Sequence, residues 1–553
     1  MSGLLSIGMR ALDANSAALQ TIGHNIANAN TAGYTRQTVR LESATGHLGM
    51  GGYIGRGVNV ASVERVYSNF LSSQLNSTHA QQAADASRAE KLGILEMNFP
   101  NGSAGLGMAI GDMLNAFSYV VAAPNDMTAR TVVLTGAQNV ADRMRSAHSE
   151  ITDLAISTRS ELQGKASQAN TLLENIAALN QQITRTQSSG QPSNDLLDHR
   201  EQYVLELNEY IQTTQLMQDD GSLTVFVANQ AAVQGSKSGS ISVVADAQDA
   251  SFSRLQLQHG SATRELDDHI IAGGQLKGLL EFEQKDLSLA KNLIGRLAMT
   301  VGLAVNQQHG AGWDFEGHPG QAMFSVSTQV AGLSVDGAQG HVLFTDPTKF
   351  SASNYVVQMD SAGTGGGHVI RQIDGHSTPF TNAANLATKT IDGLTFNLTA
   401  PALVAGQSML FKPFADAAAS IQALLTSPLN VAAASADPAL GNGTPTQMPS
   451  NSGNAKALLD IRDAKLLDGG RLTEAYATAV SQIGLRVQSV QFSLEASQSI
   501  AANMSAQKAK VSSVNLDEEA ARLMQFQQAY QASAKILQVA QRVIDTMLQE
   551  LGR

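Results

Sequence analysis

Cysteine is absent from all 553 residues of the chain. Its absence excludes disulfide bonds, thiolate metal sites and thiol nucleophiles together. Basic residues are also in deficit, since 36 lysines and arginines stand against 47 aspartates and glutamates and leave a net charge of −11. We therefore expect no general binding to nucleic acid or to anionic membranes, because both require a basic surface.

Long apolar runs are absent too. No stretch of 18 apolar residues occurs, so we expect no membrane-inserted helix. The first ten residues, MSGLLSIGMR, lack the basic start of a secretory signal, and Arg10 and Asp13 interrupt any apolar segment. We therefore expect no cleaved signal peptide. The lack of cysteine fits a bacterial protein that works outside the cytoplasm, which would then be exported by another route.

Aromatic residues make up only 5% of the chain, with a single tryptophan, Trp313. A length of 553 residues predicts about three or four domains, and 43% hydrophobic residues are enough for real cores. Few aromatics with many small and polar residues favour long, thin helical packing and glycine-rich β loops over one large core.

The last forty residues contain the most regular pattern. Apolar side chains recur every seven residues, with Phe526, Ala540 and Met547 in a second row three positions further on that only Ser533 interrupts. The seven-residue series is Leu516, Leu523, Tyr530, Leu537, Ile544 and Leu551. Asn515 is placed to cap the start of this helix. A period of 3.5 residues held over five heptads predicts a helix that buries one stripe against another helix.

The start of the chain carries a matching helix. Leu5, Leu12, Leu19 and Ile26 are also seven residues apart, and Ile22 adds to the stripe. Two such helices at opposite ends of one chain predict that the ends pack together. Burial of six stripe residues contributes on the order of 10–15 kcal/mol, against about 1–2 kcal/mol of backbone entropy for each ordered residue. We therefore expect both ends to be largely disordered in a free monomer and to fold on assembly.

The remaining pattern runs helix, β, helix, β, helix. It predicts an α+β multidomain fold with a coiled-coil stem of N- and C-terminal α-helices, a long-helix domain and inserted β-rich domains. The expected segments are a terminal assembly domain (1–60 and 511–553), a long-helix domain (61–212, 275–321 and 455–510), β-rich insertions (213–274 and 322–433) and a linker (434–454). The linker is rich in proline and glycine.

Signs of catalysis are weak. The glycine-rich loop at 46–57 lacks the spacing of a phosphate-binding loop. His309 and His318 flank Trp313, Asp314 and Glu316, and a second cluster is Asp267-Asp268-His269, but neither has a recognised metal-ligand spacing. We expect solvated loop histidines there. Asp219-Asp220-Gly221 reads as a hairpin turn. We expect no enzyme, no cofactor and no metal.

Three stretches resemble the axial proteins of the bacterial flagellum, the family of rod, hook and hook-associated proteins. They are HNIANANTAGYTRQ (24–37), GRGVNVASVERVYSNFLSSQL (55–75) and LDEEAARLMQFQQAYQASAKILQVAQRVIDTML (516–548). Arg36-Gln37, NDLLDHREQ (194–202), FQQAYQASAK (526–535), AGGQLKGLLEFEQ (272–284) and VNQQHGAGWDFEGHPGQAMF (305–324) are similar to the hook-associated members at the junction of hook and filament.

This resemblance implies a structural protein that assembles through its terminal helices and through the turn residues Asn28, Asn30, Thr31, Gly33 and Tyr34. The implied partners are other copies in a ring, the hook protein, a second junction protein and an export chaperone on the C-terminal helix. The implied location is the extracellular flagellum, reached by type III export. Two alternatives stay open: a hook or distal-rod protein, and a secreted adhesin or enzyme carried on a flagellar-type stem.

Overall fold

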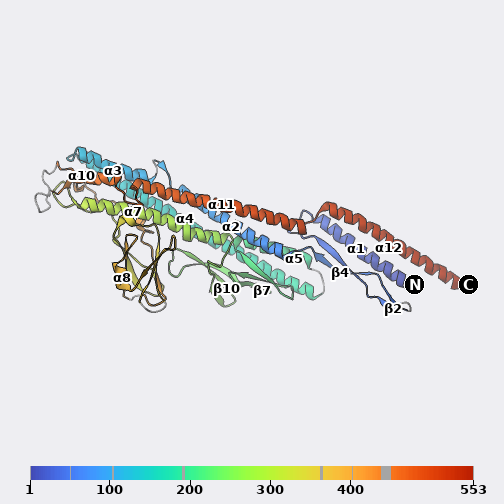
Figure 1. Ribbon diagram of the computed structural model, residues 1–553. Coiled ribbons are helices and arrows are strands. Elements are labelled where there is room, and N and C mark those ends of the chain that lie inside the picture. The colour runs from blue at the N-terminus through green and yellow to red at the C-terminus, as the bar shows by residue number, and fades with distance from the viewer. Residues whose placement is uncertain are drawn as a thin grey trace.

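The computed structural model describes residues 2–49, 52–102, 105–189, 193–360, 365–400, 403–436 and 450–551. Figure 1 shows a long, narrow molecule in which the longest helices run lengthwise and both termini lie at one end. The helices are α1 (Ser2–Ala27), α2 (Asn69–Met97), α3 (Leu106–Ala122), α4 (Met127–Ser188), α5 (Asn194–Tyr210), α6 (Gln275–Glu281), α7 (Ser288–Gly310), α8 (Ala383–Thr388), α9 (Ala417–Ser420), α10 (Gly453–Asp460), α11 (Leu472–Ser512) and α12 (Leu516–Leu551).

Every strand pairing is antiparallel among the described residues. The strands are β1 (Gln37–Ser43), β2 (His47–Gly49), β3 (Gly52–Ile54), β4 (Val58–Arg65), β5 (Thr213–Met217), β6 (Leu223–Val227), β7 (Gln230–Gln234), β8 (Lys237–Ser238), β9 (Ser240–Ala245), β10 (Ser253–His259), β11 (Ala262–Glu265), β12 (Gly312–Trp313), β13 (Gln329–Ala331), β14 (Gln339–Phe344), β15 (Tyr355–Met359), β16 (Gly367–Arg371), β17 (Ser377–Phe380), β18 (Thr390–Ile391), β19 (Leu394–Thr399), β20 (Ser408–Phe411) and β21 (Ala434–Ser435).

The stem consists of α1, α12 and strands β1–β4. Helix α12 packs against α1, as the two heptad patterns predict. The two helices are antiparallel, because residues early in α1 contact residues late in α12. Asn515 Oδ1 accepts the backbone N–H of Asp517 at 3.0 Å, which confirms the predicted cap. Strand β4 pairs with β1 and crosses the predicted segment boundary at residue 60.

The shaft is the bundle of α2, α3, α4, α5, α7 and α11. Its longest member, α4, has 62 residues and buries one face along its whole length. Residues 127–188 of the predicted long-helix domain therefore form one continuous helix. The predicted long-helix segment that begins at residue 275 is helical as far as Gly310 and contains a π-helical turn, Phe282–Leu287, between α6 and α7.

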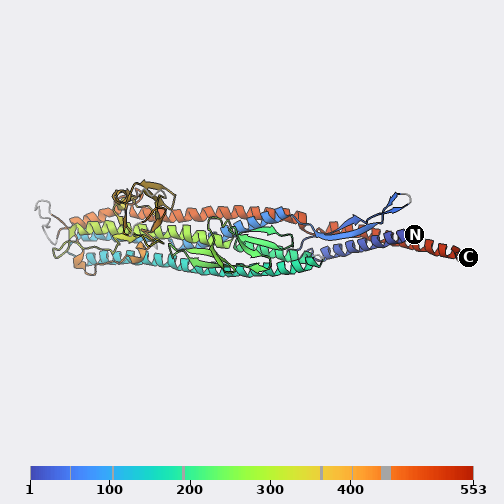
Figure 2. The same cartoon turned by 90° about the horizontal axis from the view of Figure 1, so that it is seen from below.

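Two β regions project from one side of the shaft (Figures 1 and 2). The first β region, β5–β11, forms sheets in the orders β5-β6-β7-β8 and β11-β10-β9. The second β region, β12–β21, contains two four-stranded sheets, β13-β14-β19-β18 and β17-β16-β15-β20, and the pair β12-β21. The Asp219–Gly221 turn connects β5 to β6 as predicted, with Gly221 at φ +78°.

The buried side chains form two cores. One core joins α2, α3, α7, α11 and the N-terminal half of α4 to the second β region. The other joins the C-terminal half of α4, together with α5 and α6, to the first β region. The few aromatic residues are concentrated in the first of these cores. There the ring centroids of Phe350 and Phe414 lie 5.2 Å apart in a tilted pair, and those of Phe396 and Phe411 lie 5.3 Å apart edge to face. Each β region is therefore anchored to the shaft by a shared apolar core.

The predicted α+β architecture with helical ends and inserted β regions is confirmed. Most of the predicted linker, 437–449, lies outside the described residues. Its flanks are ordered, since Ala434–Ser435 form β21 and Gly453 begins α10. None of the helices in the described ranges combines the length and apolar character needed to cross a membrane.

Candidate assembly interface

The two stem helices meet along a row of small residues. Gly8, Ala14 and Ala18 are buried on α1, and Ser533 and Ala540 are buried on α12. A Cβ atom on Gly8 would lie 3.0 Å from Cγ of Leu537. Asn15 Nδ2 donates a hydrogen bond to Ser533 Oγ at 3.2 Å. The helices therefore approach each other closely, with small side chains at the centre of the seam.

Most of the predicted stripe flanks this seam and does not form its centre. Ile22 is buried, whereas Leu516 and Tyr530 are exposed. Half-buried positions are Leu5, Leu12, Leu19, Ile26, Leu523, Phe526, Leu537 and Ile544. Leu551 ends α12, and its side chain lies outside what the structure describes. The large residues sit beside the seam because the small ones let the backbones come too close for a leucine between them.

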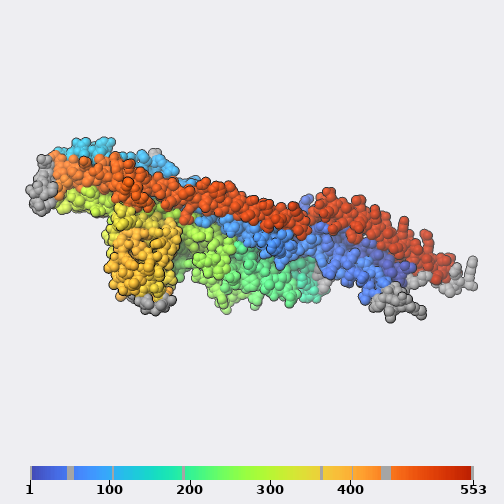
Figure 3. Space-filling model, viewed as in Figure 1, coloured from blue at the N-terminus to red at the C-terminus, as the bar shows by residue number. Residues whose placement is uncertain are grey.

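One side of α12, outside the seam with α1, carries several exposed apolar residues. We call the exposed apolar residues on this side the outer face; Figure 3 shows α12 along one side of the stem. The outer face comprises Met524, Ile536, Val539, Val543 and Met547, each at least 40% exposed. The two heptad rows counted in the sequence include Met547 but none of the other four residues, because those four lie beside both rows.

The turn after α1 is held by its own hydrogen bonds. Asn28 Nδ2 donates to the carbonyl oxygen of His24 at 3.0 Å, and the Thr31 amide donates to the Asn28 carbonyl at 2.9 Å. Gly33 has a φ of +79°, a left-handed conformation that favours glycine. Asn28 and Asn30 do not share this conformation, since neither is among the described residues with positive φ. Asn28 instead acts through its side chain, while Asn30 and Thr31 are exposed.

Asn25 connects the turn to both stem helices. Its Nδ2 donates to Glu519 Oε2 at 3.0 Å and to the Gln37 carbonyl at 2.8 Å. Its Oδ1 accepts from the Gln37 amide at 3.0 Å and from the Tyr34 hydroxyl at 2.8 Å. Burial, together with the carboxylates of Asp195, Asp198 and Glu519, raises the pKa of Tyr34, so the hydroxyl remains a donor.

A network of ion pairs, which we call the collar, joins the stem to the shaft. Arg36 contacts Glu519, which is only 1% exposed, at 3.2 Å, and the Arg36 amide donates to the Ser512 carbonyl at 2.9 Å. Its members are Arg36, Arg65, Asp198, Glu201, Lys508 and Glu519. Charged groups in this setting need partners, and each of these has one. The collar therefore fixes where the stem leaves the shaft.

The carboxylates of the collar respond differently to burial. Burial raises the pKa of Asp198, and Arg65 at 2.8 Å offsets this only in part. Burial also acts to raise the pKa of Glu201, but the Lys508 ammonium group and Arg65 outweigh it, so that pKa is lowered. Sequence reasoning missed Asp198 and Glu201 as site residues, although both lie in the NDLLDHREQ stretch that carries the family resemblance.

His309 corrects one sequence prediction. We expected a solvated loop histidine, but His309 is fully buried in the last turn of α7. Its Nδ1 lies 2.5 Å from the Gln321 carbonyl oxygen, and its Nε2 accepts the Ala432 amide at 2.8 Å. Burial lowers the pKa of His309, so the ring is neutral and links three segments of the second β region. Helix α7 extends to Gly310, so His309 belongs to the helix and not to the glycine-rich loop that follows it.

The other candidate clusters have ordinary structural partners. Asp314, Glu316 and His318 offer ligand atoms within 4.8 Å of one another. Asp314 Oδ1, however, accepts the amides of Glu316 and His318 at 2.9 and 2.8 Å, which closes the loop. In the second cluster, Asp268 pairs with Arg254 at 2.9 Å. The glycine-rich loop at 46–57 contains the β2–β3 hairpin.

Three family models match the chain. The flagellar hook-associated protein FlgK helical domain matches residues 92–324, which cover most of the shaft and the first β region. The flagellar basal body rod FlgEFG protein C-terminal model matches 507–550, and the flagella basal body rod protein model matches 5–35. The two terminal matches fall on α12 and α1, the helices of the stem.

Known relatives extend the likeness to the whole chain. Flagellar hook-associated protein 1 of Salmonella typhimurium is 31% identical over 99% of this chain and 100% of its own length. The chain belongs to the flagellar hook-associated protein 1 family. The Escherichia coli K12 relative is 30% identical over 99% of this chain and all of its own length, and the Bacillus subtilis relative is 22% identical over 99% and 98%.

A solved structure shares the fold. It is the flagellar hook junction protein FlgK from Burkholderia pseudomallei, with a TM-score of 0.72 and 22% identity, and the match covers 79% of this chain and 100% of that one. As a member of this family, the chain is a structural component of the bacterial flagellum at the junction of hook and filament.

Proposed function

We propose that the stem is the assembly domain, formed by residues 1–60 and 511–553, and that it joins the junction by packing against neighbouring subunits. The outer face of α12 is the observation that carries this proposal. A helix pair that buries only one seam leaves the apolar side of α12 in water, and a ring of copies would cover it. The predicted stripe residues beside the seam would contribute to the same contacts.

The partners follow from this position. We propose that copies of the chain assemble in a ring on the hook protein and present a surface on which a second junction protein and then the filament are built. Before assembly, a chaperone would cover α12, because its outer face is an exposed amphipathic helix surface of the kind that a groove binds. We also propose that the chain is exported to the extracellular flagellum without a cleaved signal peptide.

The alternatives receive less support. The rod-type models match only the two ends of the chain, whereas the hook-associated model matches the shaft, so a hook or distal-rod protein is not favoured. The relatives are flagellar components, and we propose that the chain acts without catalysis, metal or cofactor. Both β regions share cores with the shaft, which suits a supporting role.

Electron microscopy of a deletion strain tests the proposed function. Without this chain, hooks are expected to form normally but to carry no filaments, and filament protein should accumulate in the medium. The full-length gene supplied in trans should restore filaments. Filaments of normal length in the deletion strain would refute the junction role, and a strain without hooks would place the chain earlier in assembly.

Partial order of the free stem gives a second test. Because α12 leaves its outer face in water and the seam buries mainly small residues, the two helices gain little stability alone. We expect protease to trim residues 1–60 and 510–553 from the soluble monomer first, and to leave the shaft and both β regions intact. Mass spectrometry of the fragments reads the result, with light scattering to confirm the monomer. Protected ends in a proven monomer would contradict this expectation.

A further inference from the structure

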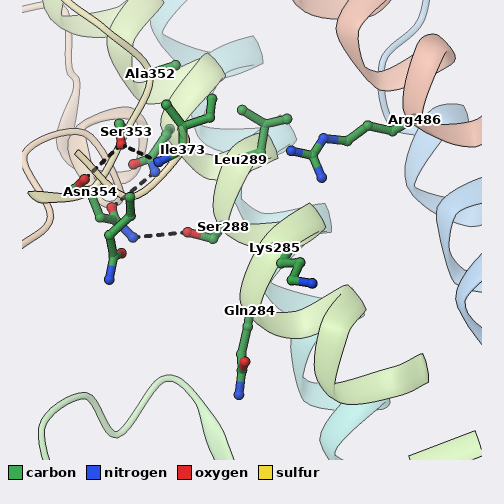
Figure 4. A pocket seen from close by; sticks show the side chains of 11 residues that line it. Gln284, Lys285, Ser288, Leu289, Ala352, Ser353, Asn354, Ile373 and Arg486 are labelled. Carbon is green, nitrogen blue, oxygen red and sulfur yellow. Dashed lines mark hydrogen bonds between the residues drawn. The ribbon is translucent and has the colours of Figure 1, made fainter. Parts of the chain in front are cut away.

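The cations around the polar cavity between the shaft and the second β region are paired within the chain (Figure 4). Lys285 Nζ donates to Glu281 Oε1 at 2.8 Å, and Arg486 Nη1 donates to Asp286 Oδ1 at 2.8 Å. The positive charge at this cavity therefore already has its counter-charge, and the cavity requires no anionic ligand.

The loop 314–318, which follows β12, differs because its carboxylates lack a lysine or arginine partner. Among the described residues, the ion pairs of Asp314 and Glu316 are with His318 alone. Arg130 acts on Asp314 only at longer range, and its guanidinium donates to backbone carbonyl oxygens. Even a protonated His318 would balance only one of the two carboxylates. The loop therefore carries an excess of negative charge.

Three possible ligand atoms converge in this loop. Asp314 Oδ2 lies 3.5 Å from His318 Nδ1, and Glu316 Oε2 lies 3.8 Å from the same nitrogen. One ligand atom from each residue lies within 4.8 Å of the other two. A tetrahedral ion with ligands at about 2.1 Å separates its ligand atoms by about 3.4 Å. The loop therefore already has nearly this spacing, and rotation of the exposed Glu316 side chain would complete it.

The fold holds Asp314 in place for such a role. Asp314 is 4% exposed, and its Oδ1 accepts the amides of Glu316 and His318 at 2.9 and 2.8 Å. Its Oδ2 has no hydrogen bond within the described residues, because 3.5 Å to His318 Nδ1 is too long for one. The Glu316 and His318 side chains are exposed, so an ion can reach all three groups. Carboxylate ligands of metal ions are commonly oriented by hydrogen bonds of this kind.

We propose that this loop binds a divalent transition metal ion of the zinc class through Asp314 Oδ2, Glu316 Oε2 and His318 Nδ1, with water completing the coordination. One imidazole nitrogen and two carboxylate oxygens suit zinc, nickel or cobalt. They are a poor set for calcium, which takes six or more oxygen ligands. The ion supplies the missing positive charge and fixes the loop beyond α7. The assembly role proposed above does not depend on this ion.

Isothermal titration calorimetry with zinc chloride tests the proposal on the full-length chain, without an affinity tag and after a chelator has removed bound metal. We expect saturable binding of one zinc ion per chain, and calcium chloride should bind at least about tenfold more weakly. Asp314→Asn, which keeps Oδ1 as the acceptor of the two amides, should weaken zinc binding about tenfold. Glu316→Gln and His318→Gln, at exposed positions, should do the same.

The matched control is His376→Gln, which removes an exposed histidine of the same β region between β16 and β17. It should bind zinc as the wild type does, and an equal loss in His376→Gln and His318→Gln would overturn the proposal. So would the absence of saturable zinc binding by the wild-type chain, or unchanged affinity in all three loop variants, with thermal unfolding confirming that they are folded. Calcium binding as tight as that of zinc would overturn the assigned class of ion.

Discussion

Leu537→Asp is expected to abolish filament assembly while the shaft and β regions stay folded. Leu537 is half-buried where α12 passes Gly8 of α1. A fully buried leucine contributes about 1.5–3 kcal/mol, and a carboxylate moved into the same place costs several kcal/mol more, as an order of magnitude. The pairing of the two stem helices is too weak to persist after such a loss of free energy. Swimming in soft agar should fall to the level of the deletion strain.

Gln538→Asp is the matched control, because residue 538 is adjacent but exposed. The Gln538→Asp variant should swim nearly as well as the wild type.

Gly8→Val tests the seam from the α1 side. A Cβ at residue 8 already lies 3.0 Å from Leu537 Cγ, so the larger valine side chain must push the two helices apart. Gly23→Val, with no atom within 4 Å of the added Cβ, provides its control. Normal swimming by both Leu537→Asp and Gly8→Val would disprove the stem as assembly domain.

Gly295→Ala is expected to produce the largest loss of stability. The Cβ of an alanine at this position of α7 would lie 1.7 Å from the carbonyl oxygen of Phe414 and 2.7 Å from its carbonyl carbon. Because these are backbone atoms, no side-chain rotation relieves the clash, and the segment around Phe414 must move away from α7. Phe414 packs against Phe350 and Phe344, so the aromatic core opens with it.

Overpacking of this kind costs about 3 kcal/mol or more where backbone has to move. Hydrogen exchange should therefore show faster opening in the second β region, with the first β region unchanged because it has its own core. Gly164→Ala in α4 is the control: it is exposed, has no atom near the added Cβ, and should be neutral or stabilising by about 0.5–1 kcal/mol. Equal exchange in Gly295→Ala and wild type would contradict the packing described for α7.

The periodic parts of the fold could be predicted from sequence. The heptads at both ends identified α1 and α12 and their packing against each other, and the β-rich stretches were identified as insertions between helical segments. Periodicity reports which side of an element is apolar, and burial of that side is a local consequence of the hydrophobic effect. The family resemblance came from sequence motifs and not from periodicity, although several of these motifs lie on the same elements and on the turn after α1.

The centre of the stem seam could not be predicted in this way. Of the two rows counted on the last helix, the structure exposes Tyr530 of the first and buries Ser533 and Ala540 of the second, and the pattern did not show which row forms the seam. Small residues allow helices to approach, but only the partner helix shows which small residues are used. The same holds for His309, which is buried because residues far along the chain, Gln321 and Ala432, bond to it.

The amino-acid sequence by itself determined the element types, the nested order of helical and β segments, and the apolar terminal helices that an axial assembly requires. These follow from local periodicity and turn chemistry. Only the tertiary structure decided the collar and the aromatic core, because each combines side chains that are far apart in the sequence: Arg65 with Glu201, and Phe350 with Phe414. No local sequence pattern shows which of these distant residues come into contact, because the contacts form only when the shaft helices pack.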